Sequence, residues 1–372
     1  MINFDHAAAA EVLPEVKKAY PQLLEQYSGN PEAAHSRGYE LRNQIKKLEA
    51  ELWRTMLPQQ PDMHGAFFAD SATTLINAAG AVFGGKGSAL ASELDHPAAE
   101  KMLKRSFKDV CYMPLDCNGR ITEIPVGVQD VQFIYLTLLQ SEIGVLQDLE
   151  LLLPALRKKY PDAFIMLDAV QFVRFYPYCA EVLPDGLLIS GAKLGAASGA
   201  ALLIGNRHFR SVKNAFDDLR KRDYLIAKSD PVSAAALVMA AKNIQESRAE
   251  ELLRCREINH FLRSKLQDLV LPSGNKLQFT VPQEFAAENI LHMILPGYQS
   301  GVLVRMFAQH GVLLSAGSAC AAESKEPSKV LQALNYSSKD SYSGLRLSFS
   351  GSNTLKEAEE FLQIFEQILK DY

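Results

Sequence analysis

Residues 163–170 read AFIMLDAV, residues 186–190 read GLLIS, and residues 199–205 read GAALLIG. Each stretch is a near-continuous apolar run, which is typical of strands buried on both faces in a parallel sheet covered by helices. Residues 132–139, QFIYLTLL, follow the same pattern. Together these stretches predict an α/β unit with a ligand site at the carboxyl ends of its strands.

Apolar residues with helical spacing alternate with these strands. The spacing is clearest over residues 39–56, 149–160, 232–269 and 355–369. Beyond residue 269 the pattern changes and predicts a smaller α+β unit, with a strand at 288–295, a helix at 300–310 and a strand at 344–349. We therefore predict a large domain over 15–250 and a small domain formed by 1–14 and 251–372.

The composition is that of a globular protein of mixed charge. The chain has 372 residues, of which 48% are hydrophobic and 22% charged, and its formal net charge is -4. These values exclude general disorder and a basic surface for nucleic acid. No run of about 18 apolar residues predicts a membrane helix. Because the first residues, MINFDHAAAA, lack the pattern of a secretion signal, we expect a cytoplasmic protein with a small-molecule substrate or a protein partner.

The cysteines are scattered through the chain, at Cys111, Cys117, Cys179, Cys255 and Cys320. None forms a CxxC pair, and no group of histidines accompanies them. Zinc sites and disulfide frameworks need closer and more regular spacing. We expect free thiols and no metal site.

Asp168 and Lys193 stand at the ends of two predicted neighbouring strands. A lysine after a strand is most often a solvated surface residue, whereas a carboxylate that ends an apolar run is costly unless it is paired. Side by side, the two would flank a pyridine ring, with Asp168 keeping the ring nitrogen protonated and Lys193 forming a Schiff base. These residues alone leave both interpretations open.

Other segments carry weaker chemical signals. Residues 70–74, DSATT, precede an apolar helix and predict either a phosphate-binding loop or an ordinary helix cap. Cys320, in a run of small residues, is either buried and inert or an exposed nucleophile. His96 is either a surface residue or a group that stacks on a flat ring. Arg346 interrupts an apolar strand, where its guanidinium needs a substrate carboxylate or an internal Asp or Glu.

Taken in order, these segments resemble the cysteine desulfurases of the NifS/IscS type, in the class V aminotransferase group of fold-type I pyridoxal-phosphate enzymes. The matching stretches span almost the whole chain: FDHAA (4–8), GNP (29–31) with His35, DSAT (70–73), DHP (95–97), EIG (142–144), DAVQ (168–171), SGAK (190–193) and GSAC (317–320). The last stretch, followed by EPSKVL (326–331), is typical of the long-loop subgroup that donates sulfur for iron-sulfur clusters and thio-modified molecules. The resemblance implies a mostly parallel seven-stranded sheet sandwiched by helices, plus a smaller α+β C-terminal domain carrying the Cys320 loop.

Carried over residue by residue, the resemblance implies pyridoxal 5'-phosphate as the cofactor and L-cysteine as the substrate. Lys193, Cys320 and His96 would be catalytic. The implied cofactor contacts are Ala72, Thr73, His96, Gln140, Asp168, Gln171, Ser190, Lys193 and Ser229, the last reaching across a homodimer. Asn30 and Arg346 would bind the substrate.

The implied reaction converts L-cysteine to L-alanine and leaves the sulfur on Cys320 as a persulfide, for delivery to an acceptor or scaffold protein. The chain departs from the family pattern near the cofactor: Ala192 replaces a histidine, Gln140 replaces an asparagine, and residues 226–229 replace a segment that contains threonine. These departures keep two alternatives open. One is a related pyridoxal-phosphate lyase or aminotransferase, and the other is a non-catalytic binding protein descended from the desulfurases.

Overall fold

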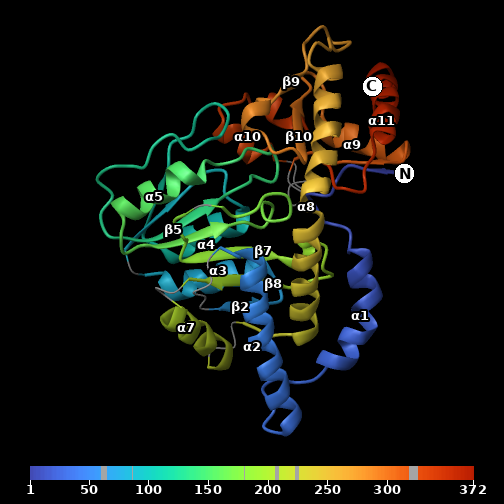
Figure 1. Cartoon of the computed structure of the whole chain (residues 1–372). Coiled ribbons are helices and arrows are strands. Elements are labelled where there is room, and N and C mark those ends of the chain that lie inside the picture. The colour runs from blue at the N-terminus through green and yellow to red at the C-terminus, as the bar shows by residue number, and fades with distance from the viewer. Residues whose placement is uncertain (60–64, 86, 180, 206–208, 223–225, 318–325) are drawn as a thin grey trace.

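The computed structural model describes residues 1–59, 65–85, 87–179, 181–205, 209–222, 226–317 and 326–372. A long helix, α8 (Pro231–Leu266), runs through the molecule beside a broad α/β unit, and a smaller unit surrounds its C-terminal half (Figure 1). Within the described ranges, no helix is both long and apolar enough to cross a membrane.

A seven-stranded sheet forms the centre of the larger unit. In spatial order its strands are β2 (Ala66–Ala69), β8 (Ala200–Ile204), β7 (Gly186–Ser190), β6 (Phe164–Asp168), β5 (Val131–Thr137), β3 (Ser88–Ala91) and β4 (Asp109–Tyr112). All are parallel except β8, which pairs antiparallel with β2 and β7. The predicted mostly parallel sheet is confirmed. The strand predicted at 199–205 is the one that runs backwards, because the short connection from β7 leaves no room for a crossover.

Alternate residues along each strand face opposite helical layers. On β6, Ile165 and Leu167 pack in one apolar cluster, whereas Phe164 and Met166 pack in another. The first cluster contains residues of α1 (Pro14–Tyr27), α2 (Ser36–Met56), α5 (Leu149–Lys159) and the first half of α8. The second contains residues of α3 (Ala72–Phe83), α4 (Pro97–Ser106) and α7 (Phe209–Lys221). Both faces of the sheet are therefore buried, which accounts for the continuous apolar runs in the sequence.

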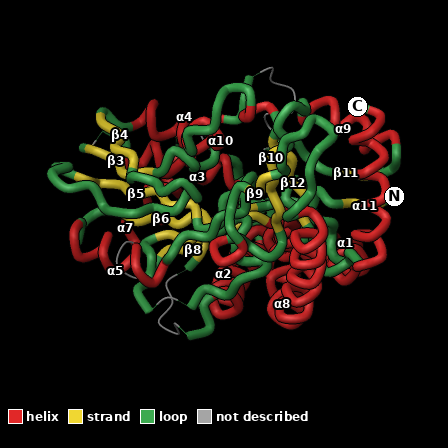
Figure 2. The backbone as a smooth tube through the Cα atoms, turned by 90° about the horizontal axis from the view of Figure 1, so that it is seen from above, coloured by secondary structure: helices red, strands yellow, loops and turns green. Residues whose placement is uncertain are grey.

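The smaller unit combines both ends of the chain. Its antiparallel sheet has the order β12 (Gly344–Ser348), β10 (Ile290–Ile294), β9 (Gln278–Phe279), and a parallel pair joins β1 (Ile2–Asn3) to β11 (Val312–Leu313). Its helices are α9 (Ser300–Gln309), α10 (Lys329–Ala333) and α11 (Leu355–Asp371), with short 3-10 turns at Gln283–Phe285 and Asp340–Tyr342. Figure 2 shows β9, β10 and β12 near the middle of the view, between the strands β3 and β5 on one side and α9, β11 and α11 with the two chain ends on the other.

A separate apolar cluster holds the smaller unit together. Ile2 and Phe4 from the N-terminus pack there with Leu262 of α8 and with Phe361 and Phe365 of α11. This clustering supports the predicted division into 15–250 and 1–14 with 251–372, which stays a prediction.

The short strands β2, β3 and β4 were not among the predicted ones. β3 reads SALA, and alanine and serine have little preference for strands. Its place in the sheet comes from pairing on both sides, with β4 and with β5. Tertiary context therefore decides these strands, whereas burial patterns alone predict β5 to β8.

Candidate active site

A cavity of about 720 Å³ lies at the carboxyl ends of β5, β6 and β7. This is the edge where open α/β sheets bind ligands. Thr137 at the end of β5 pairs with Asp168 at the end of β6. The predicted site residues His96, Gln140, Asp168, Gln171, Lys193 and Arg346 all line the cavity.

Asp168 presents a buried carboxylate to this cavity. Its side chain accepts hydrogen bonds from the hydroxyl of Tyr135 at 2.6 Å and from the backbone N–H of Val170 at 3.0 Å. Burial raises the pKa of Asp168, while these two bonds and the charge of His96 act in the opposite direction. The carboxylate is thus stabilised chiefly by neutral donors, which leaves its negative charge available to a cationic group of a ligand.

His96 lies at the N-cap of α4, facing the same cavity. Its Nδ1 accepts a hydrogen bond from the backbone N–H of Ala98 at 3.1 Å. The ring is exposed to the cavity, yet the surrounding protein lowers its pKa by burial; the charge of Asp168 opposes this shift and that of Lys193 adds to it. The neutral form of the ring is therefore favoured, and its Nδ1 is hydrogen-bonded to the start of α4.

Asp95 holds the turn that carries His96. One carboxylate oxygen accepts from the N–H of Ser92 at 2.7 Å, and the other accepts from the N–H and hydroxyl of Thr137 at 3.1 and 2.7 Å. Burial raises the pKa of Asp95 to about 7 despite these hydrogen bonds. Asp95 therefore ties the loop after β3 to the end of β5.

Lys193 projects into the cavity from the single turn of α6 (Gly191–Leu194). Its Nζ donates to the backbone oxygen of Ala7 at 2.8 Å and to that of Ala8. Gln171 Nε2 donates to the same Ala7 oxygen at 2.8 Å. Ala7 and Ala8, near the N-terminus, thus orient the amine of Lys193, which follows β7 about 185 residues later in the chain.

Gln140 and Arg346 also line the cavity. The Oε1 of Gln140 accepts from the N–H groups of Glu142 and Ile143 at 2.7 and 2.8 Å, so this side chain stabilises the turn after β5. Arg346 is only 1% exposed. It donates to the backbone oxygen of Ser141 at 2.8 Å and forms an ion pair with Asp5 at 2.7 Å. Of the two partners the sequence left open for Arg346, the structure contains the internal carboxylate.

The predicted phosphate-binding residues start from neighbouring strand ends. Ser190 ends β7 and Ala69 ends β2, and both pair with Ala200. Ala72 and Thr73 begin α3 immediately after β2. Ala72, Thr73 and Ser190 thus lie at the same edge of the sheet as α6, but they are not among the described residues that line the cavity.

Ser71 and Ser229 add two hydroxyls to this region. Ser71 Oγ caps α3 by accepting from the N–H of Thr74 at 3.2 Å, so the helix-cap interpretation of the DSATT stretch holds for Ser71. Ser229 is buried and donates to the backbone oxygen of Phe68 at 3.3 Å in its own chain.

Two other predicted residues lie elsewhere. Asn30 is exposed on the loop between α1 and α2, where its Oδ1 accepts from the N–H of Glu32 at 3.0 Å, and it does not line the cavity of its own chain. Cys320 lies outside the described residues. The described cysteines Cys111, Cys117, Cys179 and Cys255 are free thiols. Within the described ranges, no group of His, Cys, Asp and Glu side chains could hold a metal ion.

The sequence interpretation did not identify Tyr135 and Asp5 as parts of this site. A tyrosine within the apolar run FIYLT was a signal, because a buried phenol needs a hydrogen-bond partner. Asp5 stands in the matching stretch FDHAA, but nothing in the local pattern connects it with Arg346.

Comparison with known proteins is consistent with this geometry. The pattern of the family described as Aminotransferase class-V matches residues 2–216, more than half of the chain. The putative cysteine desulfurase IscS 1 of Bacillus subtilis is 24% identical over 386 residues, covering 99% of this chain and 98% of that protein. The cysteine desulfurase IscS of Dictyoglomus turgidum is 25% identical over 397 residues, covering 99% and 94%.

Solved structures resemble the fold over the full length. A NifS-like protein from Rickettsia africae has a TM-score of 0.82 at 21% identity, with 100% of both chains covered. SspA in complex with cysteine has a TM-score of 0.69 at 19% identity, covering 95% of this chain and 100% of that one. These likenesses establish the fold, and with the family match they confirm the predicted fold class. The chain belongs to the class-V aminotransferase family.

Proposed function

We propose that the protein is a pyridoxal-phosphate-dependent cysteine desulfurase, which converts L-cysteine to L-alanine and transfers the sulfur to Cys320. The central observation is that Asp168, His96, Lys193 and Arg346 line one cavity at the sheet edge. Full-length similarity to proteins named cysteine desulfurase supports the choice of reaction.

The residues present fit the cofactor. Asp168 offers a buried carboxylate stabilised mainly by neutral donors, which suits a protonated ring nitrogen. The cavity of about 720 Å³ is large enough for a cofactor and an amino acid. In this proposal Lys193 holds the cofactor covalently and His96 contacts the ring, while Gln140 and Gln171 lie beside it.

The phosphate would lie at the end of the sheet where β7 and β2 finish. Ala72 and Thr73 supply backbone N–H groups at the start of α3, and Ser190 supplies a hydroxyl. Ala192 contributes no polar side chain there. We further propose a homodimer in which Ser229 serves the partner's cofactor, for which it must exchange its bond to Phe68.

When bound, pyridoxal phosphate supplies an electron sink for the charge that develops at the substrate α-carbon. Lys193 is the proton carrier at that carbon, because its Nζ enters the cavity and is oriented by the carbonyls of Ala7 and Ala8. A second oriented group, the imidazole of His96, excludes water from one side of the reacting centre.

Arg346 would bind the substrate carboxylate. Its guanidinium is held by Asp5 and Ser141, and its Nε has no hydrogen-bond partner among the described residues. An incoming carboxylate would either share Arg346 with Asp5 or displace it, forming a charge-assisted pair. The fixed guanidinium thereby orients the amino acid before reaction.

Cys320 would act as the nucleophile toward sulfur. Its thiolate forms a bond to the substrate sulfur while the bond from that sulfur to the β-carbon breaks, and the electron pair left on carbon takes up a proton to give alanine. The chain enters and leaves this segment near Glu142, which accepts from Ser328 Oγ and packs against Gly317. Since Glu142 lines the cavity, a loop that starts and ends there can present Cys320 to it.

The persulfide would then pass to a thiol or to an acceptor or scaffold protein, as in the assembly of iron-sulfur clusters. A cysteine that must be a free thiol in the reaction suits a reducing compartment, and we propose a cytoplasmic location.

The test is turnover of L-cysteine by the purified chain loaded with pyridoxal phosphate. We expect alanine in solution and a persulfide on Cys320, detected by mass spectrometry of the peptide. Cys320→Ala should abolish both, whereas Cys117→Ala, which removes an exposed thiol, should change neither.

Two results would contradict the proposal. Amino-acid chemistry that survives in Cys320→Ala without a persulfide would favour a related lyase or aminotransferase. Failure of the wild-type chain to bind pyridoxal phosphate would favour a non-catalytic binding protein.

A further inference from the structure

A second and much smaller cavity adjoins Lys193. His6, Arg174 and Asn289 contribute to its lining, together with Lys193 and Gln171, which also line the large cavity. Its volume is about 10 Å³. One buried water molecule needs a cavity of about 10–15 Å³, so there is room for a single water.

Each of these three side chains has a polar atom without a partner. The atoms are His6 Nδ1, Arg174 Nη1 and Asn289 Oδ1, which make no hydrogen bond to any described residue. The residues are only 7%, 8% and 2% exposed. Buried polar atoms are almost always hydrogen-bonded to protein or to ordered water. Three such atoms, on residues that line one small cavity, therefore point to a ligand rather than to an empty void.

The donors and acceptors match one water molecule. His6 Nε2 lies 3.3 Å from Ser350 Oγ, so a proton on Nε2 can be donated there and Nδ1 is left as an acceptor. A water would then donate to His6 Nδ1 and Asn289 Oδ1 and accept from Arg174 Nη1. Burial lowers the pKa of His6 and keeps the ring neutral, with Arg174 in the same direction and with Glu11, Glu251 and the Asn3 carbonyl opposing.

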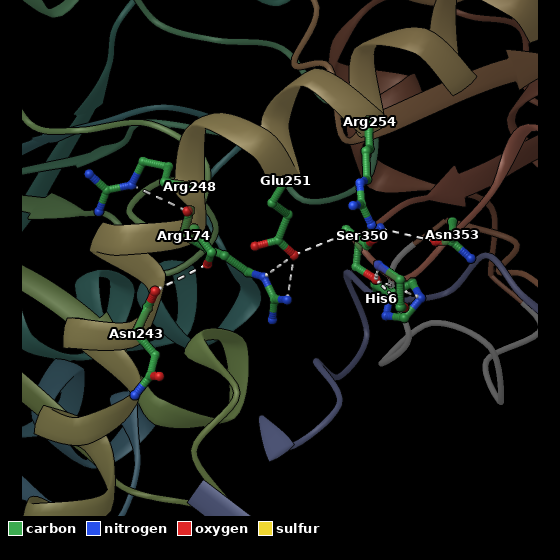
Figure 3. A network of polar contacts seen from close by, with 11 residues as sticks. His6, Arg174, Asn243, Arg248, Glu251, Arg254, Ser350 and Asn353 are labelled. Atoms are coloured by element: carbon green, nitrogen blue, oxygen red, sulfur yellow. Dashed lines mark hydrogen bonds and ion pairs between the residues drawn. The ribbon is translucent and has the colours of Figure 1, made fainter. Parts of the chain in front are cut away.

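The surroundings of this cavity are fixed by a network that connects the two units (Figure 3). Arg174 donates to Glu251 of α8 through Nε at 3.0 Å and Nη2 at 2.5 Å. The same carboxylate oxygen accepts from the N–H of Gly351 at 3.0 Å. Arg248 in turn donates to the backbone oxygens of Val173 and Arg174. The guanidinium of Arg174 is therefore fixed through Nε and Nη2, and its Nη1 makes no hydrogen bond to any described residue.

His6 also connects this network to the amine of Lys193. The next two residues, Ala7 and Ala8, supply the carbonyls that accept from Lys193 Nζ. The Ala7 N–H donates to Ser348 Oγ at 2.9 Å. Together with the contact between His6 Nε2 and Ser350 Oγ, this bond holds the segment against the strand end at residues 348–350. A shift of His6 would displace the Ala7 carbonyl, one peptide unit away, and the Ala8 carbonyl, two peptide units away.

We propose that the small cavity binds one structural water held by His6, Arg174 and Asn289, and that His6 is a positioning residue which keeps the Ala7 and Ala8 carbonyls on the Lys193 amine. The importance of this arrangement for catalysis rests on the proposed function, but the water and its effect on the amine do not.

The water is tested by crystal structures of the full-length wild type and of Asn289→Leu, which removes the acceptor while keeping similar bulk. We expect an ordered water within about 3.2 Å of all three atoms in the wild type, and none in the variant. A wild-type cavity without water would overturn the site.

The positioning role is tested by the rate at which Lys193 of the cofactor-free full chain is acetylated by acetic anhydride near neutral pH, followed by peptide mass spectrometry. His6→Ala should label roughly two- to tenfold faster, because loosening the Ala7 and Ala8 carbonyls weakens two hydrogen bonds of the amine. His6→Gln, which keeps an acceptor and a donor, should restore much of the protection. Asn289→Leu leaves the sequence of the N-terminal segment unaltered, but it should also accelerate labelling, because loss of the water loosens His6.

His35→Ala is the control, since this exposed histidine at the N-cap of α2 lines neither cavity. Circular dichroism verifies that each variant is folded. Labelling of His6→Ala and Asn289→Leu at the wild-type rate would overturn the positioning role. No substrate or cofactor enters this assay, so its outcome is independent of whether the chain proves to be a desulfurase.

Discussion

Tyr135 and Asp168 show how single residues adjust this site. The hydroxyl of Tyr135 donates to the carboxylate of Asp168 at 2.6 Å, and both side chains are buried. Burial raises the pKa of both groups, and their hydrogen bond stabilises the charged Asp168 while it raises the pKa of Tyr135 further. A neutral donor therefore supports the carboxylate without cancelling its charge.

Removing this donor should weaken cofactor binding. In Tyr135→Phe, Asp168 loses a charge-assisted hydrogen bond of about 1.5 to 3 kcal/mol, so we expect roughly ten- to a hundredfold weaker binding of pyridoxal phosphate, measured by absorbance titration. Tyr160→Phe is the control, because its hydroxyl donates to the backbone oxygen of Pro125 and Tyr160 does not line the cavity. Equal affinity in Tyr135→Phe and wild type would contradict the role given to Tyr135.

His292 predicts a pH dependence of stability. It pairs across β10 and β12 with Arg346 and is 1% exposed. Burial, and secondarily the charge of Arg346, lowers its pKa from 6.5 to about 3. Between these values the unfolded chain binds the proton and the folded chain does not, so the stability contributed by His292 is complete above pH 6.5 and falls as the pH drops toward 3.

The expected change is about 1.4 kcal/mol in the free energy of unfolding per pH unit over that window. Urea unfolding of wild type and His292→Gln at a series of pH values isolates this part, because all other titrating groups are shared. The two stability curves should converge as the pH falls below 6.5. Parallel curves would mean that His292 has the same pKa in the folded and the unfolded chain.

At the scale of elements, α6 is a single turn that carries the lysine. Gly191 begins it beside β8, where an added Cβ would lie 2.2 Å from the backbone oxygen of Ser198. Only glycine fits this approach of two backbones. The antiparallel return into β8 is thus coupled to the position of Lys193.

Gly191→Ala should therefore displace α6. We expect a loss of roughly 1–3 kcal/mol in stability from the forced shift, together with reduced attachment of pyridoxal phosphate at Lys193, measured by denaturation and by peptide mass spectrometry after reduction. Gly301→Ala is the matched control, because its Cβ would meet nothing within 4 Å in α9. It should be neutral or slightly stabilising, and equal behaviour of the two variants would refute the argument.

At the scale of the whole molecule, α8 joins two cores. Its first half packs with α1 and α2 against the large sheet, and its second half packs with α9 and α11 in the smaller unit. Glu251 lies on the second half and accepts from Arg174 of the larger unit and from Gly351 of the smaller one. This buried contact therefore fixes the position of one unit on the other.

Glu251→Ala should destabilise the protein by about 3–5 kcal/mol, because it leaves the charge of Arg174 buried without a partner. Glu250→Ala, one residue earlier, removes an exposed pair with Arg254 and should cost under about 1 kcal/mol. Chemical denaturation compares the two. A similar loss in both variants would show that the Arg174 contact does not stabilise the arrangement of the units.

Much of this fold and part of the site follow from the sequence. The apolar runs at 163–170 and 186–190 correspond to β6 and β7, and the polar residues that end them, Asp168 and Ser190, fall at the ligand edge of the sheet. Helices α2, α5, α8 and α11 begin and end close to their predicted limits. The structure brings His96, Gln140, Asp168, Gln171, Lys193 and Arg346 to one cavity. The roles of all the predicted site residues, these six included, stay predictions.

The sequence by itself determined the alternation of buried strands and helices and the residues at the strand ends, because burial imposes its periodicity on neighbours along the chain. Only the tertiary structure decided that β8 runs backwards, that Tyr135 bonds Asp168, and that Asp5 pairs with Arg346. Such contacts join residues that are distant in sequence. They depend on strand register and on the packing of two units around α8, which no local pattern records.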